Sequence, residues 1–135
     1  MPAPAPIYRA VSAPFWTGMR DGRLMIQRCD ACRRFVFYPR PFCHHCWAED
    51  PTWEQIPPFG RLVSFTVAHV PPSIDFREAW PALPAIVALA EDVRMASALV
   101  DVEASAVWIG MPLRMLFPDR QAKTPVAPSF TRDTL

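Results

Sequence analysis

Glycine and lysine are scarce in this chain of 135 residues, which contains four glycines and, at Lys123, a single lysine. Loops that cradle phosphate groups depend on several closely spaced glycines, so the sequence nearly excludes a nucleotide-binding loop of that kind. The formal net charge is only +1, which is too small to attract nucleic acid through overall electrostatics. The sequence therefore argues against a glycine-rich nucleotide-binding loop and against binding of nucleic acid through net charge.

Segments that would direct the chain into a membrane or out of the cell are also missing. The longest apolar stretch, Ala82 to Ala90, is far shorter than the roughly 20 residues of a membrane-spanning helix. Met1 to Pro6 has no basic residue of the kind that begins a secretory signal. We therefore expect a cytoplasmic protein without a membrane partner, in a compartment where cysteines stay reduced.

Patterns typical of catalysis are absent as well. The sequence has no Ser-His-acid motif and no pair of carboxylates in an obvious pocket context, so an independent hydrolase has no candidate nucleophile. His69 lies in an apolar alternating segment, and we interpret it as a core or interface histidine rather than a catalytic base. The sequence favours a binding protein over an enzyme.

Hydrophobic residues make up 51% of the chain, enough for the core of one compact domain or two very small ones. The alternating prolines at the start predict an extended tail over residues 1–11. We place a helix and a metal-binding module in residues 12–56, and a β-rich module in residues 57–135. The boundary lies in a segment, 50–58, that we predict to be a connector because Pro51, Pro57 and Pro58 interrupt it.

A short helix is expected from Ser12, a typical N-cap, to the Asp21-Gly22 pair, which is typical of a helix end. Phe15, Trp16 and Met19 would form its apolar face. A strand over 23–28 should lead into the first cysteine pair.

Alternation and turn signals predict several short strands after residue 60, and these suggest a small barrel or sandwich. The segment 85–90 should be buried on both faces, and the last strand, flanked by prolines, suits a sheet edge. A proline-rich excursion, 71–84, separates the first two strands. The predicted strands are 62–70, with Val63, Phe65, Val67 and His69 on one face, then 85–90, 94–102, 111–117 and 126–130.

The strongest chemical signal is a pair of C-x2-C motifs separated by ten residues, formed by Cys29, Cys32, Cys43 and Cys46. Each motif lets two thiolates of one tight turn converge on a metal ion, and two such turns supply a tetrahedral set of four. The spacing therefore predicts a small zinc ribbon, with iron as a possible substitute. Four sulfur ligands leave no open position for water, so the zinc should be structural.

The residues around the cysteines allow more than one interpretation. His44 and His45 are interpreted as exposed turn residues, because four cysteines already complete the site. Four arginines, Arg28, Arg33, Arg34 and Arg40, surround the motif with only Asp30 opposing them. They either contact the phosphates of a nucleotide-bearing ligand or an acidic partner, or they compensate the negative charge of the metal–thiolate centre.

The order of these features resembles a family whose members join a rubredoxin-like zinc ribbon to an OB-fold and whose genes sit beside those of thiolase-like proteins. Three positions depart from the family pattern: Arg33 and His44 stand where members often have glycine and proline, and Asp92 stands where the turn after Glu91 usually has glycine. The resemblance rests on Phe15-Trp16, Asp21-Gly22-Arg23-Leu24, Gln27-Arg28-Cys29, Cys32, Phe37-Tyr38-Pro39-Arg40, Cys43, Cys46, Gly60, Val63-Ser64-Phe65-Thr66, Glu91 and Ile109-Gly110-Met111-Pro112.

The resemblance implies a mainly β fold, with a short N-terminal helix and zinc ribbon followed by a five-stranded OB-fold barrel. It also implies a non-catalytic accessory subunit of a thiolase-like condensing or cleaving enzyme, which helps to bind or position acyl-CoA. Phe76 and Trp80, on the proline-rich excursion, are then candidate contacts with a partner or acyl-CoA, together with the four arginines.

The alternative hypothesis is a single-stranded nucleic-acid-binding OB-fold module. Against it, residues 61–135 carry seven basic and eight acidic residues, so the predicted barrel lacks a positive track for phosphates.

Overall fold

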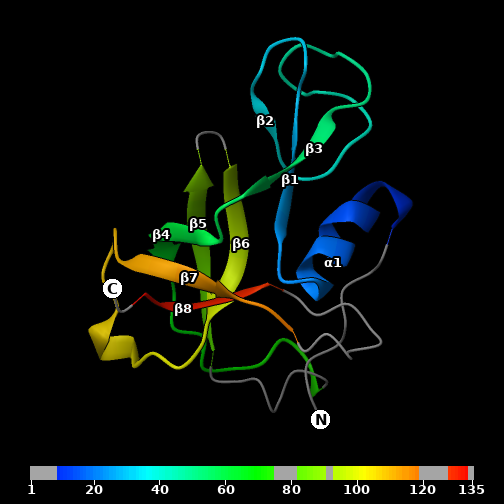
Figure 1. Cartoon of the computed structure of the whole chain (residues 1–135). Helices are drawn as coiled ribbons and strands as arrows, with labels where there is room; N and C mark the ends of the chain where they lie inside the picture. The colour runs from blue at the N-terminus through cyan, green and yellow to red at the C-terminus, as the bar shows by residue number, and fades with distance from the viewer. Residues whose placement is uncertain (1–8, 75–81, 91–92, 119–127, 134–135) are drawn as a thin grey trace.

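A computed structural model describes residues 9–74, 82–90, 93–118 and 128–133 of the chain. In Figure 1 a small three-stranded sheet and its loops stand above a five-stranded barrel. A short N-terminal helix lies beside the first strand of the small sheet. The architecture is mainly β, with the ribbon before the barrel, as the sequence predicts. No helix in the described part of the chain has the length and apolar character needed to cross a membrane.

The N-terminal helix forms where it is predicted. A 3-10 turn, η1 (Ala10–Ser12), leads into α1 (Ala13–Arg20), and Phe15 and Met19 are buried while Trp16 is half-buried. The predicted cap is only partly right, because the Ser12 side chain makes no capping hydrogen bond. Its hydroxyl donates to Arg9 O (2.9 Å) and accepts from Trp16 Nε1 (3.1 Å) instead. Ser12 therefore fixes an aromatic side chain rather than the helix end.

The ribbon sheet consists of β1 (Leu24–Arg28), β2 (Phe35–Val36) and β3 (Thr52–Ile56) in the order β2-β1-β3, with both pairings antiparallel. The predicted connector over 50–58 is wrong, because β3 lies within it and pairs with the whole of β1. Its prolines flank the strand rather than interrupt it, so no ladder hydrogen bond is lost.

The barrel is closed by five strands in the order β4-β5-β6-β8-β7. All neighbours are antiparallel except β6 and β8, which meet in parallel at Leu99 and Phe130. The number of strands agrees with the predicted OB-fold barrel. The strands are β4 (Phe59–Phe65), β5 (Leu83–Ala90), β6 (Val93–Leu99), β7 (Pro112–Leu116) and β8 (Ser129–Arg132), and η3 (Ala104–Ala106) lies between β6 and β7.

Several details of the barrel differ from the sequence-based expectation. β4 ends at Phe65, so Val67 and His69 are exposed rather than part of an apolar strand face. A register shift between Leu62 and Ser64 breaks the simple alternation and leaves Leu62, not Val63, in the core. The strand around residues 85–90 is not buried on both faces, since buried and half-buried residues alternate along its first half.

The last strand is also placed differently from the prediction. β8 begins at Ser129 and lies between β6 and β7, so it closes the barrel instead of forming an edge. A barrel has no free edge once its first and last strands are joined, and this tertiary closure is invisible in local sequence. The turn predicted at Glu91-Asp92 lies outside the described residues.

One hydrophobic core runs from the helix through the base of the ribbon into the barrel. Phe15 and Met19 of α1, and Leu24 and Ile26 of β1, belong to the same buried cluster as the barrel residues. The upper ribbon has a separate, much smaller cluster formed by Cys29, Val36 and Cys43. The barrel members of the large cluster include Leu62, Val87, Val93, Met95, Met111, Leu113 and Phe130.

Two sets of polar contacts hold the ribbon loop after β2 in place. The buried side chain of Gln27 accepts a hydrogen bond from Arg40 N and donates one to Arg40 O, both at 2.9 Å. The Tyr38 hydroxyl, on the same loop, accepts a hydrogen bond from Ala96 N in β6 at 3.0 Å. The loop therefore ties the ribbon to the barrel. Together with Trp16, Phe37 and Met95, Tyr38 lines an apolar cleft of about 190 Å³ at this junction.

Replacing Tyr38 with phenylalanine tests this tie. The change keeps the ring but removes the acceptor for Ala96 N–H, and one hydrogen bond contributes about 1 kcal/mol net. Exchange of the Ala96 amide hydrogen should become roughly fivefold faster, measured by NMR hydrogen exchange. The amide of Val87, deep in β5, is the internal control and should keep its protection. An unchanged Ala96 rate would show that the hydroxyl does not hold the two parts together.

Candidate metal centre

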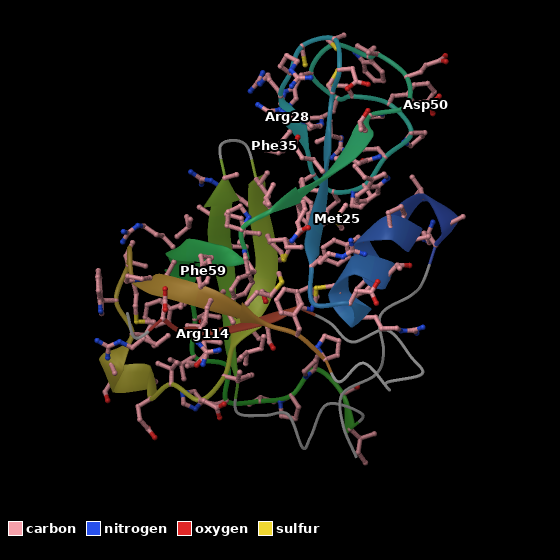
Figure 2. All side chains as sticks on the ribbon, viewed as in Figure 1. Met25, Arg28, Phe35, Asp50, Phe59 and Arg114 are labelled. Atoms are coloured by element: carbon pink, nitrogen blue, oxygen red, sulfur yellow. The ribbon has the colours of Figure 1, made fainter. Side chains whose placement is uncertain are left out.

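The four cysteines predicted as metal ligands come together at the tip of the ribbon. Cys29 and Cys32 lie on the turn that follows β1, and Cys43 and Cys46 lie on a second turn between β2 and β3. All four sulfur atoms are within 4.8 Å of one another. Figure 2 shows sulfur atoms at the top of the ribbon, above the labelled Arg28 and Phe35.

The two turns repeat one hydrogen-bond pattern. In the first, Cys29 N donates to Arg34 O and Arg33 N donates to Cys29 O, both at 2.9 Å. In the second, Cys43 N donates to Ala48 O at 2.9 Å and Trp47 N donates to Cys43 O at 2.8 Å. The chain thus builds the same knuckle twice, and each knuckle supplies two sulfur atoms.

Each knuckle ends in a residue with a left-handed backbone. Arg33 has φ 66° and Trp47 has φ 67°, at the fourth position after the first cysteine of each pair. Glycine adopts this conformation without strain, which explains why family members often have glycine at the position of Arg33. Arg33 keeps the turn that glycine would make, so the departure in sequence does not change the knuckle.

The sulfur positions fit a tetrahedral metal ion. Cys29 Sγ and Cys46 Sγ are 3.5 Å apart, and Cys32 Sγ and Cys43 Sγ are 3.7 Å apart. A tetrahedron with metal–sulfur distances of about 2.3 Å has edges of about 3.8 Å. The donor set therefore fits an ion such as zinc. Its four ligands would fill every position of a tetrahedral ion, so no coordination position is left for water.

Backbone N–H groups lie close to two of the sulfur atoms. Cys32 N lies 3.5 Å from Cys29 Sγ, and His45 N donates to Cys43 Sγ at 3.3 Å. The Cys32 amide is the main cause that lowers the pKa of the Cys29 thiol from 9.0 to about 7, against the opposing effect of desolvation. The first knuckle thus already favours deprotonation of one ligand.

The histidines lie beside the site rather than in it. His45 Nε2 is 3.3 Å from Phe35 O, and its ring contacts that of His44, with centroids 3.9 Å apart and planes tilted by 40°. Among the described residues, the group able to hold a metal consists of the four cysteines alone. The interpretation as exposed turn residues is right for His44, whereas His45 is half-buried.

The four arginines play different local roles. Arg28 Nε donates to Arg33 O at 2.8 Å, its guanidinium carbon lies 4.7 Å from the centroid of the Phe35 ring, and Nη1 is 3.6 Å from Glu54. Arg40 Nε donates to Tyr38 O at 3.2 Å. Arg33 and Arg34 are exposed. Asp30 is therefore not the only opposing acid, because pairing of β1 with β3 brings Glu54 beside Arg28.

Two of the predicted contact residues cannot be compared with the structure, and two residues that hold the ribbon in place are not predicted from the sequence. Phe76 and Trp80 lie outside the described residues. Sequence pattern alone predicts no site role for Gln27 or Tyr38, although both lie in segments that carry the family resemblance. The signal for Gln27 is a glutamine within a short, mostly apolar strand, because buried polar side chains need partners.

Comparisons with known proteins agree with this geometry. Residues 16–52 match the family described as ChsH2, rubredoxin-like zinc ribbon domain, and residues 53–118 match ChsH2, C-terminal OB-fold domain. A solved structure named Ltp2-ChsH2(DUF35) aldolase has a TM-score of 0.79 and 30% identity, and the match covers 94% of this chain and 98% of that chain. This chain belongs to the ChsH2 family.

Two further proteins are similar to this ChsH2-family chain. A DUF35-family protein of unknown function from Sulfolobus solfataricus shares the fold, with a TM-score of 0.66 and 17% identity over 92% of this chain and 86% of that chain. A protein of Thermomonospora curvata named probable enoyl-CoA hydratase alpha subunit is 34% identical over 110 residues. That match covers 82% of this chain but only 34% of the relative, so the chain spans about a third of its length.

Removing single ligands tests the metal centre. We expect about one metal ion per chain, since one tetrahedral sulfur set is present, measured by elemental mass spectrometry of the purified protein. Cys29→Ala or Cys43→Ala should abolish stoichiometric binding and unfold the upper ribbon, which has little core of its own. His44→Ala and His45→Ala are matched controls and should keep the metal. Disulfides in place of bound metal in the unmodified protein would contradict the assignment.

Proposed function

We propose that this ChsH2-family chain is a non-catalytic accessory subunit of a thiolase-like enzyme and helps it to bind or position an acyl-CoA substrate. The observation that carries the proposal is the likeness to a solved chain whose name joins ChsH2 to an aldolase, over nearly the full length of that chain. Zinc is the metal we assign to the sulfur site, on its donor set and on the name of the matching ribbon domain.

The chemistry of the metal centre supports a structural role for zinc. When bound, the ion would offset half of the charge of the four thiolates and fix the two knuckles relative to each other. The complete sulfur set leaves no coordination position at which the ion could activate water or polarise a substrate carbonyl. Cys29, Cys32, Cys43 and Cys46 would therefore stabilise the ribbon while the reaction takes place on the partner subunit.

The predicted contact residues remain part of the proposal. The exposed Arg33 and Arg34 are suited to phosphates or carboxylates of a partner or of acyl-CoA. Arg28 and Arg40 also make contacts within the ribbon, so their replacement would test its structure as well as binding. Phe76 and Trp80 stay candidate contacts on the proline-rich segment.

The accessory role makes a direct prediction about activity. The pure chain should neither hydrate, cleave nor hydrolyse acyl-CoA, measured by chromatographic detection of products. It should co-purify as a stable complex with a thiolase-like protein from the same genome when the two are expressed together. Turnover by the chain alone that disappears with one of its own point mutations would refute the proposal.

A hydratase partner is the second candidate, because the Thermomonospora curvata relative is named as an enoyl-CoA hydratase subunit. The same co-expression distinguishes the two candidates. Complex formation with a hydratase protein from the same genome, and none with the thiolase-like protein, would transfer the proposal to the hydratase.

Binding of single-stranded nucleic acid separates the accessory role from the nucleic-acid alternative. Residues 61–135 carry one more acidic than basic residue, and phosphate neutralisation dominates the affinity of proteins for nucleic acid. Single-stranded DNA or RNA should therefore bind only weakly at physiological salt, measured by fluorescence anisotropy with a labelled oligonucleotide. Tight binding that weakens steeply as salt increases would favour the OB-fold as a nucleic-acid module.

A further inference from the structure

A tight turn on the barrel exposes two large apolar side chains. Met111 N donates to Trp108 O at 3.1 Å, and Gly110 has φ 91°, which makes residues 108–111 a turn of the type that needs glycine at its third position. Trp108 is 51% exposed and Ile109 is 59% exposed. Turn positions usually carry Gly, Pro, Asn, Asp or Ser, so this pair breaks the local pattern. Such violations tend to mark functional positions.

The turn is firmly attached to the neighbouring strand. Gly110 N donates to Leu62 O at 2.8 Å, and Leu62 N donates to Met111 O at 3.0 Å. Arg61 Nη1 also donates to Gly110 O at 3.1 Å. Because the backbone is already fixed, docking onto Trp108 and Ile109 would lose little conformational entropy.

Phe59 and two arginines lie on β4 and β7 next to this turn, and Arg61 joins them to it through Gly110 O. Phe59 is 45% exposed and lies directly opposite Arg114, so both side chains are on the same face of the sheet. Arg61 is two residues further along β4 and therefore shares that face. Figure 2 shows the labelled Phe59 and Arg114 on these adjoining strands of the barrel. We call this surface, formed by Phe59, Arg61, Trp108, Ile109 and Arg114, the Trp108 patch.

The charge of the Trp108 patch differs from that of the barrel as a whole. Residues 59–65 and 107–116 contain Arg61 and Arg114 and no acidic residue, although residues 61–135 together carry a net charge of −1. Both arginines are exposed, and no carboxylate within the described ranges forms an ion pair with either. Within the part of the chain that the structure describes, no acidic group offsets these two charges, and such a surface suits an acidic partner.

We propose that the Trp108 patch is the surface on which the enzyme subunit docks, through an apolar pocket for Trp108 flanked by acidic residues that meet Arg61 and Arg114. The composition fits such an interface, since aromatic residues and arginine are enriched at protein contacts and dominate their binding energy. This inference rests on the proposed accessory role and adds to it the side of the molecule that the partner covers. The surface lies on the barrel, away from the arginines of the ribbon tip.

The experiment measures the affinity of the full chain for the thiolase-like subunit by biolayer interferometry. Trp108→Ala should weaken binding by roughly tenfold or more, the scale of an interface anchor, while Trp108→Phe should lose clearly less. The double change Arg61→Glu with Arg114→Glu should weaken binding and slow association. The double change Arg20→Glu with Arg94→Glu is the matched control, because it alters net charge equally at exposed arginines outside the patch. Metal content and melting temperature establish that each variant is folded.

The possible outcomes separate the two proposals. Full-strength binding by Trp108→Ala and by the Arg61 and Arg114 variant would overturn the docking surface and leave the accessory role intact. No binding by the unmodified chain would overturn both. If the patch variants lose affinity for coenzyme A alone but not for the subunit, the surface holds a small anionic ligand and the proposed docking site is wrong.

Discussion

Four thiolates within 4.8 Å of one another cannot remain together without a cation, and the upper half of the molecule depends on this constraint. Its own apolar cluster contains only Cys29, Val36 and Cys43, two of which are metal ligands. The two knuckles compensate partly by directing backbone N–H groups at sulfur. The ribbon loop that carries Tyr38 lies between the two knuckles in the sequence, and its contact with β6 joins this part of the molecule to the barrel.

The features that local sequence predicts correctly are those with local causes. The C-x2-C spacing identifies the ligand set because a two-residue gap is itself the geometry of the turn. The helix is recognisable because its apolar face and the Asp21-Gly22 pair act within a few residues. The order of zinc ribbon and five-stranded barrel comes from the family resemblance, and the strand alternation alone left a sandwich open as an alternative.

The features that local sequence misplaces depend on distant partners. β3 is hidden by its flanking prolines and forms because β1 offers it a complete ladder. β8 looks like an edge strand until β6 and β7 enclose it. The register shift after Leu62 reverses which side chain of β4 enters the core. Gln27 satisfies its buried amide with the backbone of Arg40, thirteen residues away. The separation into modules at residue 57 stays a prediction.

The shared hydrophobic core has a consequence for how such chains evolve. The boundary between the two matched family segments, at residues 52 and 53, falls inside β3, a strand fully paired with β1. Leu24, Ile26 and Ile56 belong to the same buried cluster as the barrel interior. A recombination event at that boundary would uncover apolar surface on both products. Selection should therefore keep the ribbon and the barrel together. We expect genes to gain, fuse or lose the two as a single unit.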